Sequence, residues 1–268
     1  MAKLIGLGTK RIWEDEESVF VLSTGRTGTQ TLAHLLALSP AIDAYHEPSP
    51  VLVAEATDAR HEIYSNIRKY ERIFISAKGL ALFRSKRRGK IYAETSARLT
   101  FFAPVIATVL PKAKFIHIHR DPAAIVRSGM RRGWYQNHKG DHLRPEPVAG
   151  ESLNEKWETL DQFSKICWYW EAYNSFAIRF FDSIASARCL AIEAEDLFSG
   201  TAVPSIFRFI GVPAPSLKQV RTILGHKLNK QQSGHFPFRE EWTPEMHSTL
   251  QDIAEKTILH LGYGSRHA

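Results

Sequence analysis

The chain has 268 residues, of which 44% are hydrophobic and 24% are charged, and its formal net charge is +7. These proportions are typical of a globular protein, and no run approaches the roughly 18 apolar residues that suggest a membrane span. Residues 1–17 hold only a short apolar patch before an acidic run, which argues against a secretory signal.

Five short apolar segments of strand type alternate with segments of helical periodicity. The expected strands are residues 19–23, 41–45, 91–94, 115–119 and 189–193. This alternation predicts an α/β, P-loop-like three-layer fold, with a central, mainly parallel sheet and helices on both faces. Helices are expected after the first strand, over 101–110 and, as a pair in the core, over 154–183. We expect a single domain, residues 1–268, with 137–150 as a mobile loop.

The first expected strand runs into the loop STGRTGT, residues 23–29, and a helix-like pattern follows. Backbone N–H groups and the helix dipole at such a junction attract an anion. Gly25 and Gly28 let the backbone approach a ligand closely, and Thr27, Thr29 and Thr31 can donate hydroxyl hydrogen bonds.

This loop differs from that of a nucleoside triphosphatase, GxxxxGK[ST], because no lysine precedes the hydroxyl in Gly28-Thr29-Gln30-Thr31. The positive charge lies two residues before Gly28 instead, at Arg26, where a guanidinium can fork onto a phosphate. The loop therefore predicts an anion site without the metal-centred chemistry of a kinase.

Positive charge is also concentrated in RSKRRGK, Arg84 to Lys90. The run is either a solvated loop or a surface for an anionic partner, such as a nucleotide, a glycan, nucleic acid or the lipid headgroups of a membrane that it contacts peripherally. No zinc module, aromatic-rich RNA motif or long basic arm accompanies it, so a nucleic-acid partner is not favoured.

The fourth expected strand leads into a second informative stretch, IHIHRDPAAIVRS. Asp121 is a good N-cap and Pro122 suits the first helical position, so Ser128 lies about 9 Å further along the helix axis. Arg120 and Ser128 could then face one compact anion, although Arg120 taken alone is better explained as a surface ion-pair residue. His117 and His119 are expected to be satisfied core histidines rather than metal ligands.

The loop and this second stretch together resemble the two cofactor signatures of the sulfotransferases that use 3′-phosphoadenosine 5′-phosphosulfate (PAPS). The resemblance covers most of the chain, and it is weakest at residues 54–89 and 137–150. It implies that Arg26, Thr27, Gly28, Thr29 and Gln30 hold the 5′-phosphosulfate and that Arg120 and Ser128 hold the 3′-phosphate. No metal is required by these motifs. Late in the chain, KLNKQQSG is similar to a cofactor-closing loop, which makes Lys227, Asn229, Lys230 and Ser233 candidate phosphate contacts or else solvent-facing residues.

The resemblance also implies an acceptor hydroxyl, on a glycan, glycolipid or other metabolite, and a base that takes its proton. The second strand ends at His46 and Glu47, in a stretch similar to carbohydrate- and glycolipid-type members, where a carboxylate is the base. Glu47 is therefore the first candidate base and His46 the second, with helix capping as the alternative role of Glu47. Glu94, Thr95, Ser96 and Arg98, after the third strand, are expected either to contact the acceptor or to cap a helix.

Two other functions remain open at this point. A degenerate P-loop kinase would require magnesium-dependent ATP hydrolysis, and a non-catalytic module would bind anionic polymers without turnover. The cysteines Cys167 and Cys189 lie in apolar surroundings, so we expect buried free thiols, as in a cytoplasmic protein.

Overall fold

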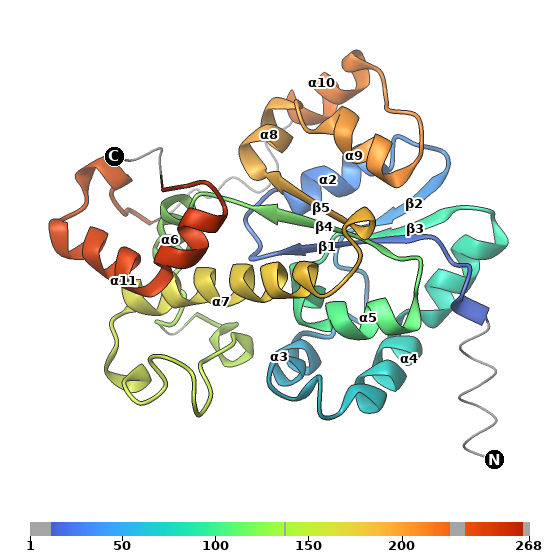
Figure 1. Ribbon diagram of the computed structural model, residues 1–268. Coiled ribbons are helices and arrows are strands. Elements are labelled where there is room, and N and C mark those ends of the chain that lie inside the picture. The colour runs from blue at the N-terminus through green and yellow to red at the C-terminus, as the bar shows by residue number, and fades with distance from the viewer. Residues whose placement is uncertain (1–11, 137, 226–233, 265–268) are drawn as a thin grey trace.

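The central sheet of the protein has five parallel strands in the order β2-β3-β1-β4-β5 (Figure 1). This computed structural model describes residues 12–136, 138–225 and 234–264. The strands are β1 Ser18–Ser23, β2 Ile42–Tyr45, β3 Ile91–Glu94, β4 Lys114–His119 and β5 Cys189–Glu193. Each lies within one residue of its sequence prediction, and the three-layer α/β fold is confirmed.

Helices cover both faces of this sheet. On one face lie α2 Thr29–Leu36, α8 Ala194–Ser199, α9 Val203–Ile210 and α10 Leu217–Gly225. On the other lie α3 Val53–Glu62, α4 Ile67–Arg87, α5 Ala103–Val109 and α7 Gln162–Asp182. Two further α-helices are α6 Pro122–Met130 and α11 Pro244–His260. Among the described helices, none is both long enough and apolar enough to cross a membrane.

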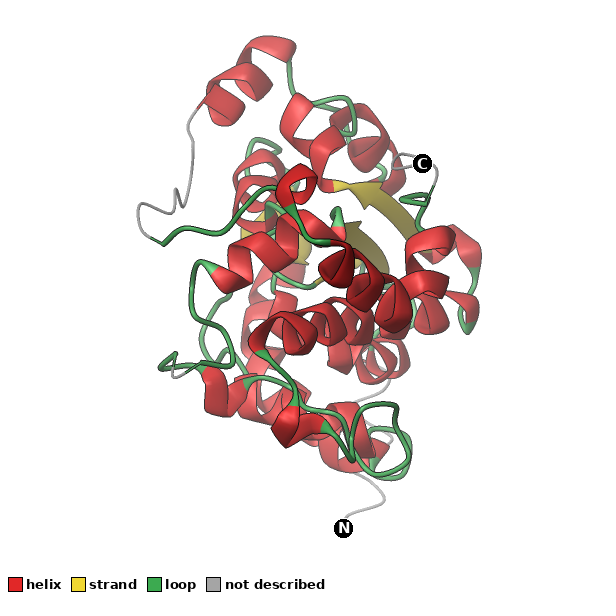
Figure 2. Cartoon of the chain, turned by 90° about the vertical axis from the view of Figure 1, so that its left-hand side faces the viewer, coloured by secondary structure: helices red, strands yellow, loops and turns green. Residues whose placement is uncertain are grey.

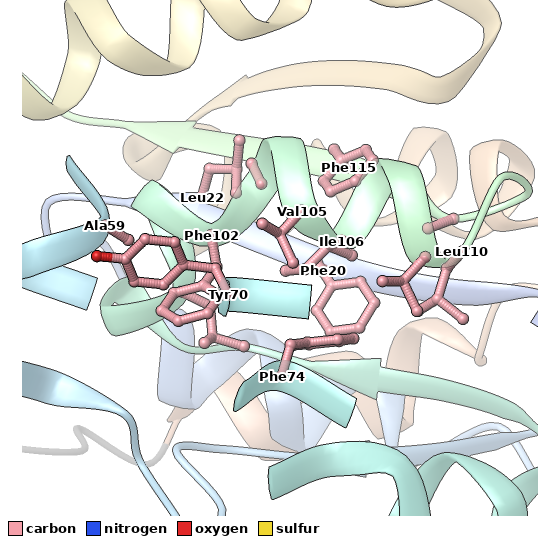
Figure 3. Close-up of a cluster of buried hydrophobic side chains, with 14 of the residues drawn as sticks. Phe20, Leu22, Ala59, Tyr70, Phe74, Phe102, Val105, Ile106, Leu110 and Phe115 are labelled. Carbon is pink, nitrogen blue, oxygen red and sulfur yellow. The ribbon is translucent and has the colours of Figure 1, made fainter. Parts of the chain in front are cut away.

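The alternation of side chains along β1 divides the core into two layers. Phe20 and Leu22 point toward α4 and α5, where Phe20 packs against Phe74 at 5.9 Å between ring centroids (Figure 3). Val19 and Val21 point to the opposite face and pack with α2 and α9. Both faces of the strand are thus buried, which explains its nearly continuous apolar sequence.

A third apolar cluster joins α6, α7 and α11 beside the sheet. In place of the expected helix pair, α7 is one helix of 21 residues, capped by the Asp161 carboxylate, which accepts from the Ser164 N–H at 2.7 Å. Residues 152–159, before this cap, form turns and the short 3₁₀-helix Trp157–Thr159 in place of an α-helix. Figure 2 shows the helices that pack together at this side of the molecule.

The segment 137–150 contains a short 3₁₀-helix, Asp141–Leu143, and no α-helix among its described residues. Its Leu143 carbonyl accepts a hydrogen bond from Thr57 at 3.0 Å, and Pro145 accepts one from Tyr135 at 2.6 Å. The expected mobility of this loop stays a prediction.

Gly129 is expected to be intolerant of substitution, because a Cβ there would lie 2.8 Å from the Trp134 ring and 3.0 Å from Ile166. We expect Gly129→Ala to destabilise the protein by about 1–3 kcal/mol through overpacking. Gly79, in the middle of α4, is the matched control, since its Cβ would meet only ordinary contacts, the nearest at 3.5 Å. Thermal unfolding should show a lower Tm for Gly129→Ala alone, and equal values would contradict the packing argument.

Candidate active site

A cavity of about 740 Å³ opens at the carboxyl ends of β1, β2, β3 and β4. Open α/β sheets bind ligands at this edge, at the point where the connections after neighbouring strands run to opposite faces of the sheet. Segments that follow these four strands contribute to the wall, together with Tyr169 of α7, Phe198 of α8 and Leu224 of α10. The lining residues are Thr24, Gly25, Arg26, Gly28, Thr29, Gln30, Thr31, His46, Glu47, Ala97, Arg98, Arg120, Arg132, Trp134, His138, Arg144, Tyr169, Phe198 and Leu224.

The loop between β1 and α2 has the unusual backbone that its glycines suggest. Gly25, Arg26 and Gly28 have φ values of 74°, 61° and 89°. A Cβ on Gly28 would lie 2.6 Å from the Phe198 ring. Both the positive φ and this lack of space therefore require glycine at position 28. The loop is held from below by Tyr169, whose hydroxyl donates to the Thr24 carbonyl at 2.8 Å.

The structure places most, though not all, of the predicted loop residues on the cavity wall. Arg26, Gly28, Thr29 and Gln30 line it. Thr27 is fully buried and does not line this cavity, and its hydroxyl has no hydrogen-bond partner among the described residues.

Three guanidinium groups gather around this loop. Arg120 follows β4, donates to the Arg26 carbonyl at 3.1 Å and pairs with Glu195 at 3.1 Å. Burial lowers the pKa of Arg26, and the neighbouring charges of Arg132 and Arg120 lower it further. Mutual repulsion of this kind is relieved by a bound anion, so the cluster is electrostatically suited to a phosphate or sulfate group.

A second cavity, of about 360 Å³, adjoins the first, and Arg26 and Arg120 line both. Its wall brings together Arg120 and Ser128, the pair expected to share one anion. Arg127 and Arg131 of the α6 region also line it, as does Arg239 from the C-terminal part of the chain. The two expected anion sites are therefore neighbours joined at two arginines.

The segment after residue 233 packs against this second cavity. The Gly234 carbonyl accepts from Arg131 at 2.9 Å, the Phe236 carbonyl accepts from Arg127 at 3.1 Å, and the Phe238 ring lies 3.9 Å from the Arg127 guanidinium. The candidate contacts Lys227, Asn229, Lys230 and Ser233 lie outside the described residues.

Both candidate bases, His46 and Glu47, line the first cavity. The Nδ1 atom of His46 lies 2.8 Å from the Thr95 carbonyl, which can only accept, so Nδ1 carries the proton. In the neutral ring, Nε2 is then free to accept a proton. Glu47 is exposed, has a φ of 45°, and its carboxylate has no hydrogen bond among the described residues.

Other residues singled out from the sequence lie elsewhere. Glu94 is not on the cavity wall: it is buried against Lys78 at 2.9 Å and accepts from the Tyr92 hydroxyl at 2.6 Å. Thr95 and Ser96 are also buried, whereas Arg98 lines the cavity.

His117 and His119 are buried in the core, as expected. His117 contacts the Asn174 amide oxygen at 2.9 Å, and burial lowers its pKa to about 3. His119 contacts the Tyr263 hydroxyl at 2.8 Å. The two thiols are unpaired; Cys167 is buried, and Cys189 is only half-buried.

Sequence reasoning missed several residues of the wall. Arg132 and Trp134 belong to the same RSGMRRGWY stretch as Ser128, so proximity along the chain was a usable signal. His138, Arg144 and Tyr169 gave none, because long-range packing alone brings them to the strand ends.

Comparisons with known proteins agree with this fold. The model of the sulfotransferase family matches residues 18–215. Sulfotransferase STF9 from Mycobacterium avium is similar in structure, with a TM-score of 0.54 and 14% identity over 97% of this chain and 80% of that one. The sulfotransferase domain of the Synechococcus PCC 7002 olefin synthase has a TM-score of 0.50 and 14% identity, over 95% and 89% of the two chains. No curated protein matches the sequence.

Proposed function

Because the chain belongs to the sulfotransferase family, we propose that it transfers a sulfuryl group from PAPS to an acceptor hydroxyl. The observation that carries this proposal is the pair of cationic cavities that meet at Arg26 and Arg120. PAPS has two anionic groups on one nucleoside, and two neighbouring anion sites match that distribution of charge.

The proposed donor site spans both cavities, with one anionic group of PAPS in each. The loop residues Arg26, Gly28, Thr29 and Gln30 bind the 5′-phosphosulfate at the start of α2, with Thr27 supporting the loop from its buried side. Arg120 and Ser128 bind the 3′-phosphate, and the nearby Arg127, Arg131 and Arg239 add positive charge. Lys227 and Asn229 remain proposed contacts from the sequence alone.

The proposed reaction is an in-line displacement at sulfur. The acceptor oxygen forms a bond to sulfur while the bond from sulfur to the 5′-phosphate oxygen breaks, and that oxygen keeps the electron pair. Arg26 neutralises the charge that grows on the leaving phosphate. The acceptor proton passes to a base, which we propose to be the Glu47 carboxylate, with His46 Nε2 as the second candidate. The acceptor is a hydroxyl compound of the glycan, glycolipid or small-metabolite class.

Nucleotide binding tests the donor assignment. We expect 3′-phosphoadenosine 5′-phosphate (PAP) to bind at least about tenfold more tightly than AMP, because charge-assisted hydrogen bonds at Arg120 and Ser128 require the 3′-phosphate. Ser128→Ala should weaken PAP binding while AMP binding stays unchanged. Calorimetry with both nucleotides and both proteins measures these differences.

Equal affinity for PAP and AMP in the unaltered protein would overturn the proposal. Magnesium-dependent ATP hydrolysis would instead support a kinase, and polyanion binding that Arg26→Ala leaves intact would support a non-catalytic module.

A further inference from the structure

The first cavity holds more positive charge than the sulfuryl donor accounts for. Its wall carries five arginines and two histidines, whereas Glu47 is its one carboxylate among the described residues. Arg26, Arg120 and Arg132 form the group around the donor loop. Arg98 and Arg144 also line the cavity but do not belong to this group around the donor loop.

We propose that Arg98 and Arg144 bind an anionic group on the acceptor, so that the substrate is a hydroxyl compound that also carries a carboxylate or sulfate. This inference rests on the proposed function, because it assigns the acceptor side of the same cavity. Neither arginine is needed for the donor contacts proposed above.

Arg98 is positioned beside the donor loop. It follows β3 in the short 3₁₀-helix Ala97–Phe102, and its neighbour Ala97 lies 3.7 Å from the place a Cβ on Gly25 would occupy. Its side chain is half-buried and, within the parts of the chain that the structure describes, has neither an ion pair nor a hydrogen bond. A half-buried guanidinium without a counter-charge favours a ligand that supplies one.

Arg144 is held rigidly on the same wall. It is only 7% exposed, its Nε donates to the Asp141 carboxylate at 2.8 Å, and its guanidinium lies 4.2 Å from the centroid of the Trp134 ring. The Nη2 atom lies 3.5 Å from His138 Nδ1, and Nη1 has no hydrogen-bond partner among the described residues, so Nη1 can donate to a ligand. A guanidinium fixed in this way loses little side-chain entropy on binding.

The two arginines share the wall of the first cavity with Tyr169, whose hydroxyl donates to the Thr24 carbonyl of the donor loop at 2.8 Å. Burial raises the pKa of Tyr169, the charges of Arg98 and Arg144 lower it, and the charge of Glu47 raises it. All three charged residues line the same cavity as this phenol ring. An acceptor whose hydroxyl faces Glu47 can thus place a second, anionic group near Arg98 and Arg144.

Matched probes test this assignment in the protein saturated with PAP. We would measure the binding of glucuronate against glucuronamide, 4-hydroxyphenylacetate against its amide, and galactose 6-sulfate against galactose by calorimetry. In at least one pair, the anion should bind about tenfold or more tightly than its neutral analogue, as expected for a charge-assisted hydrogen bond. The carboxylate and sulfate pairs distinguish the two kinds of anion.

Arg98→Gln should remove that preference and leave PAP affinity unchanged, whereas Arg72→Gln, on the exposed face of α4, is the control that should keep it. The inference is overturned if PAP binds normally and no anion exceeds its neutral analogue, or if Arg98→Gln keeps the preference. Loss of PAP binding in the unaltered protein would instead reject the donor assignment, and this inference with it.

Discussion

Glu47→Gln is expected to lower the turnover number by about 10²- to 10⁴-fold, the usual contribution of a positioned general base. The amide has nearly the same shape as the carboxylate but cannot take the acceptor proton. Glu47 is exposed on the cavity wall and its carboxylate has no hydrogen bond among the described residues, so the substitution should leave the fold intact. PAP affinity should not change, because the expected loss affects proton transfer alone.

The measurement is transfer of radiolabelled sulfuryl groups from PAPS to a panel of candidate acceptors, with the two proteins run in parallel. His46→Asn is the companion variant, because the Asn amide can still donate to the Thr95 carbonyl but lacks the Nε2 atom that would take the substrate's proton. If Glu47→Gln keeps full turnover and His46→Asn loses it, the base is His46 and not Glu47.

The sheet could be predicted from the sequence because its strands are short, apolar and separated by helical patterns. Burial of both faces makes Phe20, Val21 and Leu22 one continuous apolar run. The crossover connections that parallel strands require then place helices on the faces of the sheet. The helix boundaries were harder, since they depend on local hydrogen bonds. The Asp161 cap begins α7 there, and the residues before it form turns and a 3₁₀-helix instead of the first helix of the expected pair.

The candidate site was predictable where neighbours in space are neighbours in sequence. Arg120 and Ser128 lie on one strand–helix junction, so their shared cavity follows from local geometry. Arg144 and Tyr169 reach the strand ends only through tertiary packing, and no spacing rule connects them with the donor loop. Glu94 was placed at the correct strand end, but its side chain points into the core, because Lys78 of α4 meets it there.

The Lys78–Glu94 pair supports the second large prediction, which concerns stability. The two side chains are 1% and 0% exposed and 2.9 Å apart. Removal of one partner leaves the other as a buried charge, so Lys78→Met should lower the free energy of unfolding by about 3–5 kcal/mol. Lys78 also donates to the Pro48 carbonyl at 2.8 Å, so the variant should loosen the segment that carries Glu47 as well. Urea unfolding at neutral pH measures the loss.

The double variant Lys78→Met, Glu94→Gln is the control, because it removes both charges and should recover much of the stability that the single variant loses.

The pH dependence of stability gives an independent check. Burial raises the pKa of Glu94 even in the paired state, and loss of the Lys78 charge, which lowers it, should raise that pKa further. The folded state then binds the Glu94 proton more tightly than the unfolded state, so the stability of Lys78→Met should fall as the pH rises from 5 to 8. A single variant that is as stable as the unaltered protein at pH 8 would show that the pair contributes little, and the segment 46–48 would then depend on its contact with Thr95.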